Sequence, residues 1–146
     1  MEIMGTTLAV AASALRAERQ RLDIIASNLA NSNTTETAAG GPYKRRNVIF
    51  TAREVGNSDF GDTLVALADK PQGVQVTDVI EDQTPPRQVF DPGHPDANAE
   101  GYVLYPNINP VTEMVDLQTA TRAYEANVQV VNATKKMAES ALAIGA

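Results

Sequence analysis

The sequence predicts an α+β protein in which long N- and C-terminal helices form a paired helical stalk and a small β-rich middle domain is inserted between them. Two observations support this prediction. All eight prolines lie between Pro42 and Pro110, and seven of the nine glycines lie between Gly40 and Gly101, so helix-breaking residues are concentrated in the middle. At both ends, apolar residues recur at helical spacing instead. The expected parts are residues 1–35, 36–109 and 110–146.

The first part contains a seam of residues alternately four and three positions apart, which is the a/d pattern of helices that pack against other helices. We expect a helix over residues 3–30, about 42 Å long at 1.5 Å per residue. Its seam consists of Met4, Leu8, Ala11, Leu15, Glu18, Leu22, Ile25 and Leu29, with one polar member. Alanines occupy many of the other positions and allow a partner helix to approach closely.

The middle part contains four short segments whose residues favour strands. The expected strands span residues 45–52, 73–80, 87–90 and 102–105. With three phenylalanines and three of the four tyrosines across it, this part offers little apolar surface for two helices of such length. The helices therefore need apolar partners that the β-rich part cannot supply.

The last part begins with a clear helix start, because Asn109 is a good N-cap, Pro110 suits the first helical position and Glu113 lies in the first turn. The helix is expected to reach about 50 Å. Its seam is Met114, Leu117, Thr121, Tyr124, Val128, Val131, Lys135, Ala138 and Leu142. A second apolar row beside that seam is Ala126, Val130, Ala133, Met137, Ala141 and Ile144. Two rows require several neighbours rather than one partner helix.

This surplus of apolar surface predicts a structural subunit of a larger assembly. If the two helices paired only with each other, the second row would stay exposed, and exposed patches of that size mark interaction surfaces. The alternative is an intramolecular antiparallel hairpin that packs on the β-rich domain. In both cases the helices form core or interface, and no cofactor is expected.

Composition excludes several classes of protein. The net charge of −6 argues against nucleic-acid binding, which needs a basic patch. The absence of cysteine excludes disulfides, thiolate metal sites and cysteine nucleophiles. The uncharged stretch between Glu2 and Arg16 is shorter than the roughly 18 residues that a membrane span needs, and no basic segment precedes it. We therefore expect a chain that does not span a membrane, and export by the general secretory route is not indicated.

Catalytic and metal-binding signals are weak. Asp91, His94, Asp96 and Glu100 lie within ten residues and could suggest a metal site, but prolines on both sides of His94 favour a turn whose polar side chains bond their own backbone. Glu81 and Asp82 follow a strand and indicate a solvated strand end rather than an acid–base pair. We expect no enzyme, no metal site and no small-molecule substrate.

Two further polar segments have structural interpretations. Lys44, Arg45 and Arg46 form a basic run at the start of the first strand, where a polar edge or an interface salt bridge is favoured over phosphate binding. Residues 28–35 read NLANSNTT, and their amides are expected to cap carbonyls at the end of the first helix.

The same polar segment carries a family resemblance. Residues 27–34, SNLANSNT, resemble the ANNLANANT signature of bacterial flagellar rod and hook proteins. The matching residues are Asn28, Leu29, Ala30, Asn31, Asn33 and Thr34. The loop DPGHPDANAEGYV at 91–103 looks like that of the proximal-rod member of this family, through Asp91, Pro92, Gly93, His94, Pro95, Gly101 and Tyr102. Ser27, where the family more often has asparagine, and the stretch 35–38 are departures.

The resemblance implies a subunit that the flagellar type III apparatus exports without a cleaved signal peptide. This subunit would polymerise with itself and other rod subunits into the shaft crossing the periplasm. Its work would be torque transmission. The terminal helices would pair into the inner layer of a tube. The expected assembly interface is Leu8, Leu15, Leu22, Ile25, Leu29, Met114, Leu117, Tyr124, Val128, Val131 and Leu142. The alternative function is a stand-alone ligand- or metal-binding module with a helical hairpin.

Overall fold

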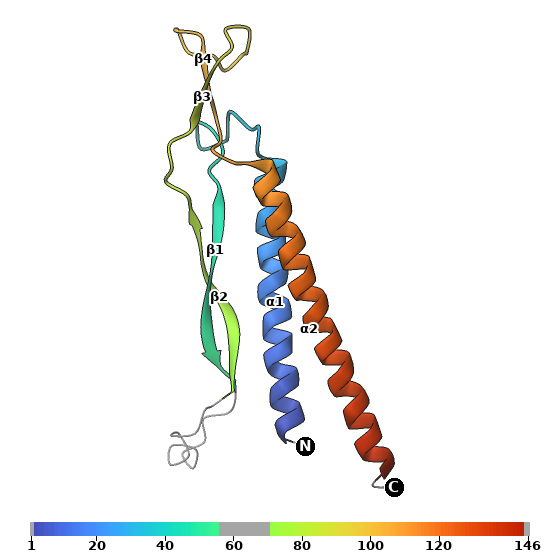
Figure 1. Cartoon of the computed structure of the whole chain (residues 1–146). Coiled ribbons are helices and arrows are strands. Elements are labelled where there is room, and N and C mark those ends of the chain that lie inside the picture. The colour runs from blue at the N-terminus through green and yellow to red at the C-terminus, as the bar shows by residue number, and fades with distance from the viewer. Residues whose placement is uncertain (1, 56–70, 145–146) are drawn as a thin grey trace. The chain divides into compact units, whose positions relative to one another are not determined.

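A computed structural model describes residues 2–55 and 71–144, and Figure 1 traces their elements in chain order. The elements are α1 (Glu2–Ala30), β1 (Arg46–Glu54), β2 (Gln72–Glu81), β3 (Arg87–Phe90), β4 (Tyr102–Tyr105) and α2 (Pro110–Ile144). Two long terminal helices thus enclose a small antiparallel β region in the sequence, as predicted for an α+β chain. Each of the four expected strands is present, and β1 continues two residues further than its pattern indicated.

The strands form two separate two-stranded sheets, β1 with β2 and β3 with β4. In the first, the Asp82 amide donates to the Arg45 carbonyl at 2.7 Å, and the Val55 amide donates to the Pro71 carbonyl at 3.3 Å. The beginning of one strand therefore faces the end of the other, which is the antiparallel arrangement. In the second sheet, Phe90 lies opposite Tyr102.

The chain divides into two compact units, and each long helix contributes to both. The first unit contains the described residues of 1–20, 50–77 and 121–146. Within it, the Val74 amide donates to the Ser13 hydroxyl at 3.0 Å, so the start of β2 is bonded directly to α1. Ala11 and Ala17 are buried there, as expected of small residues that allow close approach.

The second unit contains residues 21–49 and 78–120, and therefore the end of α1, the start of α2 and the β3–β4 hairpin. Its buried apolar side chains are aliphatic. They are Ile25, Val103, Ile108 and Ala120. This unit also contains the polar segment 27–34 and the loop 91–101, which are the two segments that carried the family resemblance.

The helix boundaries follow local signals in the sequence. Asn109 caps α2 as expected, because its side-chain oxygen accepts from the Val111 amide at 3.0 Å and its carbonyl accepts from the Glu113 amide at 3.1 Å. At the end of α1, the Asn31 side-chain amide donates to the Ser27 carbonyl at 2.9 Å, which confirms the expected capping. Neither helix, over the residues the structure describes, is long and apolar enough to cross a membrane.

The buried stripe of α2 is rotated relative to the predicted seam. Leu117, Tyr124, Val131 and Ala138 are at least partly buried, as predicted. Between them, the predicted positions Met114, Thr121 and Lys135 are exposed, and the preceding residues Glu113, Ala120 and Thr134 are buried instead. The pattern of apolar residues placed Met114 inside, whereas the structure places a carboxylate there. Glu113 can be buried because Arg45 and Asn28 donate hydrogen bonds to its carboxylate.

Candidate functional site

The site is the motif junction, a group of polar side chains around the end of α1. We use this name for Ser27, Asn28, Tyr43, Arg45, Arg46 and Glu113, all of which belong to the second compact unit. They come from three elements or their flanks: α1, the approach to β1 and the first turn of α2.

Asn28 is the centre of the motif junction and is 1% exposed. Its side-chain nitrogen donates to the Arg46 carbonyl at 2.8 Å, and its side-chain oxygen accepts from the Arg46 amide at 2.9 Å. A single amide side chain thus pairs both backbone groups of the first residue of β1, as a neighbouring strand would. The Tyr43 hydroxyl also donates to the Asn28 oxygen, at 3.2 Å. Asn28 therefore bonds β1, and is more than a helix cap.

Glu113 supplies the matching carboxylate from α2, and its side chain is 1% exposed. Arg45 Nε donates to its Oε1 at 2.6 Å, and the Asn28 side-chain nitrogen donates to its Oε2 at 3.2 Å. Both carboxylate oxygens are therefore bonded, and one bond comes from a charged donor, which is the arrangement that makes a buried carboxylate tolerable.

The three residues of the basic run have separate roles within the chain. Besides Glu113, Arg45 contacts Asp116 at 3.5 Å. Lys44 and Glu81 form a loose pair at 4.0 Å, with both side chains about half exposed. Arg46 lies over the Tyr43 ring, 5.7 Å from its centroid. Lys44 and Arg45 thus form salt bridges within the chain, and the interface salt bridge expected of this run stays a prediction.

The rest of the family motif shapes the chain between α1 and β1. Thr34 donates through its hydroxyl to Asn31 at 3.1 Å, and its carbonyl accepts from the Tyr43 amide at 3.1 Å. Ser27, the departure from the family pattern, lies with its hydroxyl 3.2 Å from that of Tyr43. Leu29 is half-buried, whereas Ala30 and Asn33 are exposed. The motif residues thus differ in burial. Asn28 is the one whose side chain is bonded to Arg46, Tyr43 and Glu113.

The second predicted segment, the loop from Asp91 to Gly101, closes the β3–β4 hairpin with its own hydrogen bonds. Asp91 accepts from the Gly93 amide at 3.2 Å, and His94 Nδ1 accepts from the Asp96 amide at 3.1 Å. The Asp91 amide donates to the Gly101 carbonyl at 2.9 Å. Polar side chains therefore bond their own backbone here, as the flanking prolines predicted.

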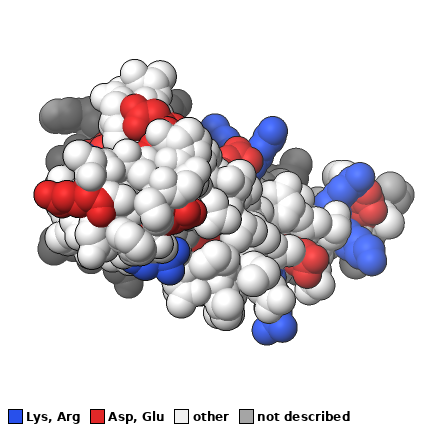
Figure 2. Space-filling view, turned by 90° about the horizontal axis from the view of Figure 1, so that it is seen from above, with Lys and Arg blue, Asp and Glu red and all other residues white. Residues whose placement is uncertain are grey.

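The acidic residues of this hairpin do not gather around one point. Figure 2 shows the chain from above, with acidic side chains at several separate places on a mostly uncharged surface. Within residues 2–55 and 71–144, no group of three or more His, Asp and Glu side chains is placed to hold a metal ion. Asp96 is instead bonded by the Thr35 hydroxyl at 2.7 Å, which joins the hairpin to the segment after the family motif. Glu81 pairs with Lys44, and Asp82 accepts from the Thr84 amide at 2.9 Å.

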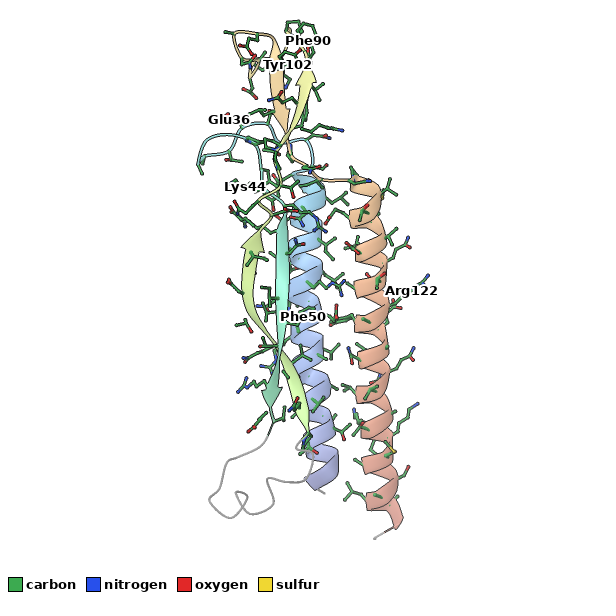
Figure 3. All side chains as sticks on the ribbon, turned by 60° about the vertical axis from the view of Figure 1, so that its left-hand side comes forward. Glu36, Lys44, Phe50, Phe90, Tyr102 and Arg122 are labelled. Atoms are coloured by element: carbon green, nitrogen blue, oxygen red, sulfur yellow. The ribbon has the colours of Figure 1, made fainter. Side chains whose placement is uncertain are left out.

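The two faces of the β3–β4 hairpin differ in exposure. Val103 is fully buried, whereas Phe90 is 64% exposed and Tyr102 is 41% exposed. The rings of Phe90 and Tyr102 contact edge to face with centroids 5.3 Å apart, and Figure 3 shows them together near the tip. The remaining loop residues that carried the resemblance, Pro92, Gly93 and Pro95, are exposed.

The predicted interface residues range from buried to exposed. Ile25 is buried, and the half-buried members are Leu15, Leu22, Leu29, Leu117, Tyr124, Val128 and Val131. The exposed members are Leu8, Met114 and Leu142. In the second apolar row, Ala126, Val130, Ala133, Met137 and Ala141 are exposed. The side chains of Met4 and Ile144 lie outside the described ones.

Sequence reasoning missed the roles of Glu113 and Arg45. The sequence predicts Glu113 only as a first-turn acidic residue, and Arg45 only as part of a basic run with a polar edge or an interface salt bridge. One signal in the sequence could have identified them. An arginine and a carboxylate that could form an ion pair occur together with Asn28, which lies at the end of an apolar seam. Their separation of 68 residues in the chain made that pairing invisible to local patterns.

Comparison with known proteins finds two family models that match the two ends of the chain. A family model described as "Flagella basal body rod protein" matches residues 8–36, which include the family motif. A second model, "Flagellar basal body rod FlgEFG protein C-terminal", matches residues 99–144, which include α2.

Whole-length relatives are also similar to this chain. The flagellar basal-body rod protein FlgC of Bacillus subtilis is 44% identical over 144 residues, covering 95% of this chain and 96% of the relative. The protein of the same name from Borreliella burgdorferi is 42% identical over 145 residues, covering 95% of each chain. That from Escherichia coli O157:H7 is 41% identical over 136 residues, covering 93% of each.

Proposed function

Because the chain belongs to the flagellar basal-body rod protein FlgC family, we propose that it acts as a structural subunit of the bacterial flagellar rod that assembles with other rod subunits. Its relatives are named as rod proteins, and no catalytic family is indicated among them. The structural observation that carries the proposal is the exposed apolar row on α2.

The described side chains of this row are exposed in the single chain. Val130 is 43% exposed and Met137 is 57% exposed, and alanines occupy the positions between and beside them. Burying such side chains removes apolar area from water at about 25 cal/mol per Å². Neighbouring subunits that cover this row would therefore gain stability that the single chain lacks.

The finer architecture follows from the same reasoning. In the assembled rod, α1 and α2 pair as a stalk, and neighbouring stalks cover Leu8, Met114 and Leu142 as well as the second row. The stalks form the inner wall of a shaft that crosses the periplasm and transmits torque. The β-rich residues 36–109 project outward from it. The chain reaches the rod through the flagellar type III export apparatus, without a cleaved signal peptide.

Hydrogen exchange on the dilute chain tests whether the parts of the helices in the first compact unit, which contain Leu15 and Val128, are completed only on assembly. A helix that lacks its partners loses most of its stability, because isolated helices are marginal in water. We expect weak amide protection at Leu15 and Val128 in the free chain and strong protection in the rod. Strong protection at both positions in the dilute chain would contradict assembly-coupled ordering.

Basal bodies provide the direct test of the rod assignment. A strain that lacks this chain should be non-motile and should not complete its rods, and an epitope-tagged copy should restore both. The tag should then be found in purified basal bodies at the rod by immuno-electron microscopy. Normal rods in the strain without the chain would refute the proposal.

A further inference from the structure

We propose that the contact between Asn28 and Glu113 sets the axial register of α2 against the end of α1, so that the helices dock in one alignment only. This inference concerns the isolated chain and goes beyond its role in a rod. Its failure would leave the rod assignment untouched.

The apolar part of α2 cannot set this register alone. Its least exposed positions repeat every seven residues, through the buried Glu113, Ala120 and Thr134 and the half-buried Asn127. Residues Leu117, Tyr124, Val131 and Ala138 repeat in the same way between them. Apolar contacts are not directional, and the buried apolar residues of α1 are Ala11, Ala17 and Ile25 among those described. Such repetitive surfaces tolerate a shift of one heptad, which moves a helix by about 10 Å.

Two of the polar residues in the stripe are also indifferent to register. The Asn127 side-chain amide donates to the Ala123 carbonyl at 3.0 Å. The Thr134 hydroxyl donates to the Val130 carbonyl at 2.9 Å. Both acceptors belong to α2 itself, so both bonds move with the helix when it shifts.

Glu113 differs, because the side-chain bonds to its two oxygens come from other segments. Arg45 donates to one oxygen and Asn28 to the other, at 2.6 Å and 3.2 Å. A shift of α2 would leave this buried carboxylate without these donors, which is strongly unfavourable. A buried polar group that selects one alignment of helices is the best attested specificity role for such groups.

Asn28 cannot follow a shifted helix. Its side chain is bonded to both backbone groups of Arg46, at 2.8 Å and 2.9 Å, so its position is set by β1. Arg45, the other donor, is the next residue along the same backbone. The two donors to Glu113 therefore have fixed positions relative to each other. Glu113 reaches both donors only when α2 is in one alignment.

Spin labels can measure the register directly, because the chain contains no cysteine. Labels at Asp23→Cys and Gln118→Cys lie on exposed positions of α1 and α2 within the same compact unit. Pulsed electron resonance on the dilute chain should give one narrow distance distribution.

Glu113→Leu removes the carboxylate and keeps an apolar side chain of similar size. We expect the helix content to stay the same and a second distance to appear, displaced by a heptad shift. Asp116→Leu, which removes the other carboxylate near Arg45, is the matched control and should keep the single distance. A single unshifted distance in Glu113→Leu would overturn the proposal.

A variant on α1 keeps the test decisive if Glu113→Leu loses its helix content. Asn28→Ala removes the same contact from the other side and should also give two distances. Glu113→Gln retains a polar group that needs partners and should keep one distance. A single unshifted distance in Asn28→Ala would count against the register role.

Discussion

Gly73 lies so close to Ser13 that a Cβ at position 73 would be 2.6 Å from the Ser13 hydroxyl oxygen. That hydroxyl cannot easily move, because it donates to the Val10 carbonyl at 2.7 Å and accepts from the Val74 amide at 3.0 Å. The absence of a side chain at residue 73 is thus what lets β2 approach α1.

Gly73→Ala should therefore destabilise the chain by about 1–3 kcal/mol, the usual cost of overpacking a filled site. Gly5→Ala is the control, because nothing lies within 4 Å of a Cβ there and alanine favours a helix. Urea unfolding should show a loss of stability in the first variant and none in the second. Equal midpoints would mean that β2 does not pack against Ser13.

The hairpin loop offers a second matched pair of glycines. Gly101 has a φ of +82°, and a Cβ there would be 2.9 Å from the Phe90 ring, whereas a Cβ at Gly93 meets only an Asp91 oxygen at 3.6 Å. Gly101→Ala should cost at least about 1–2 kcal/mol from the left-handed backbone. Gly93→Ala should change little. Thermal unfolding of the two variants compares them, and equal losses would contradict the loop conformation.

Replacing the adjacent basic residues Lys44 and Arg45 should reduce the stability of the chain by very different amounts. Arg45→Ala leaves the buried Glu113 without its charged partner and should destabilise the chain by about 3–5 kcal/mol. Lys44→Ala removes only the exposed 4.0 Å pair with Glu81 and should cost about 0–1 kcal/mol. Chemical unfolding of both variants tests the motif junction. A tolerated Arg45→Ala would show that Glu113 is not held as described.

Leu22 tests the helical seam in the cell. Leu22→Asp places a charge on a half-buried seam position, which is costly because the charge loses its water. We expect non-motile cells without completed rods. Asp23→Asn, at the exposed neighbouring position, should swim normally. Normal swimming of the Leu22→Asp strain would refute the assignment of this residue to the seam.

The Asp82 carboxylate should have a measurably lowered pKa in the folded chain. The Thr84 hydroxyl, then the Thr84 amide, donate to it and hold its pKa below the ordinary value; Arg45 acts in the same direction. Because the folded-state pKa is depressed, its stabilisation is present above the unfolded pKa of about 3.9 and is lost as pH falls through the folded pKa.

Carboxyl NMR titration of Asp82 measures this shift. The titration midpoint should lie below the ordinary value in the parent chain and should rise in Thr84→Ala. An unchanged midpoint in that variant would mean that Thr84 is not the main cause.

Local signals in the sequence were sufficient for the secondary structure. The Asn109–Pro110 pair predicted the start of α2 at Pro110, and the alternating residues of the middle predicted strands that the structure places within two residues of the expected bounds. These features depend on residues a few positions apart, so a linear pattern contains them. The family motif could likewise be recognised from the sequence, because its residues are consecutive.

The tertiary structure decided which face of α2 is buried and what Asn28 does. The apolar pattern favoured Met114 over Glu113, because a lone carboxylate is costly to bury. That cost is offset only by donors 68 and 85 residues away, Arg45 and Asn28. No local pattern records that these donors meet the carboxylate. The sequence alone therefore determined that the ends are helices with apolar faces, and only long-range hydrogen bonding determined how α2 is turned.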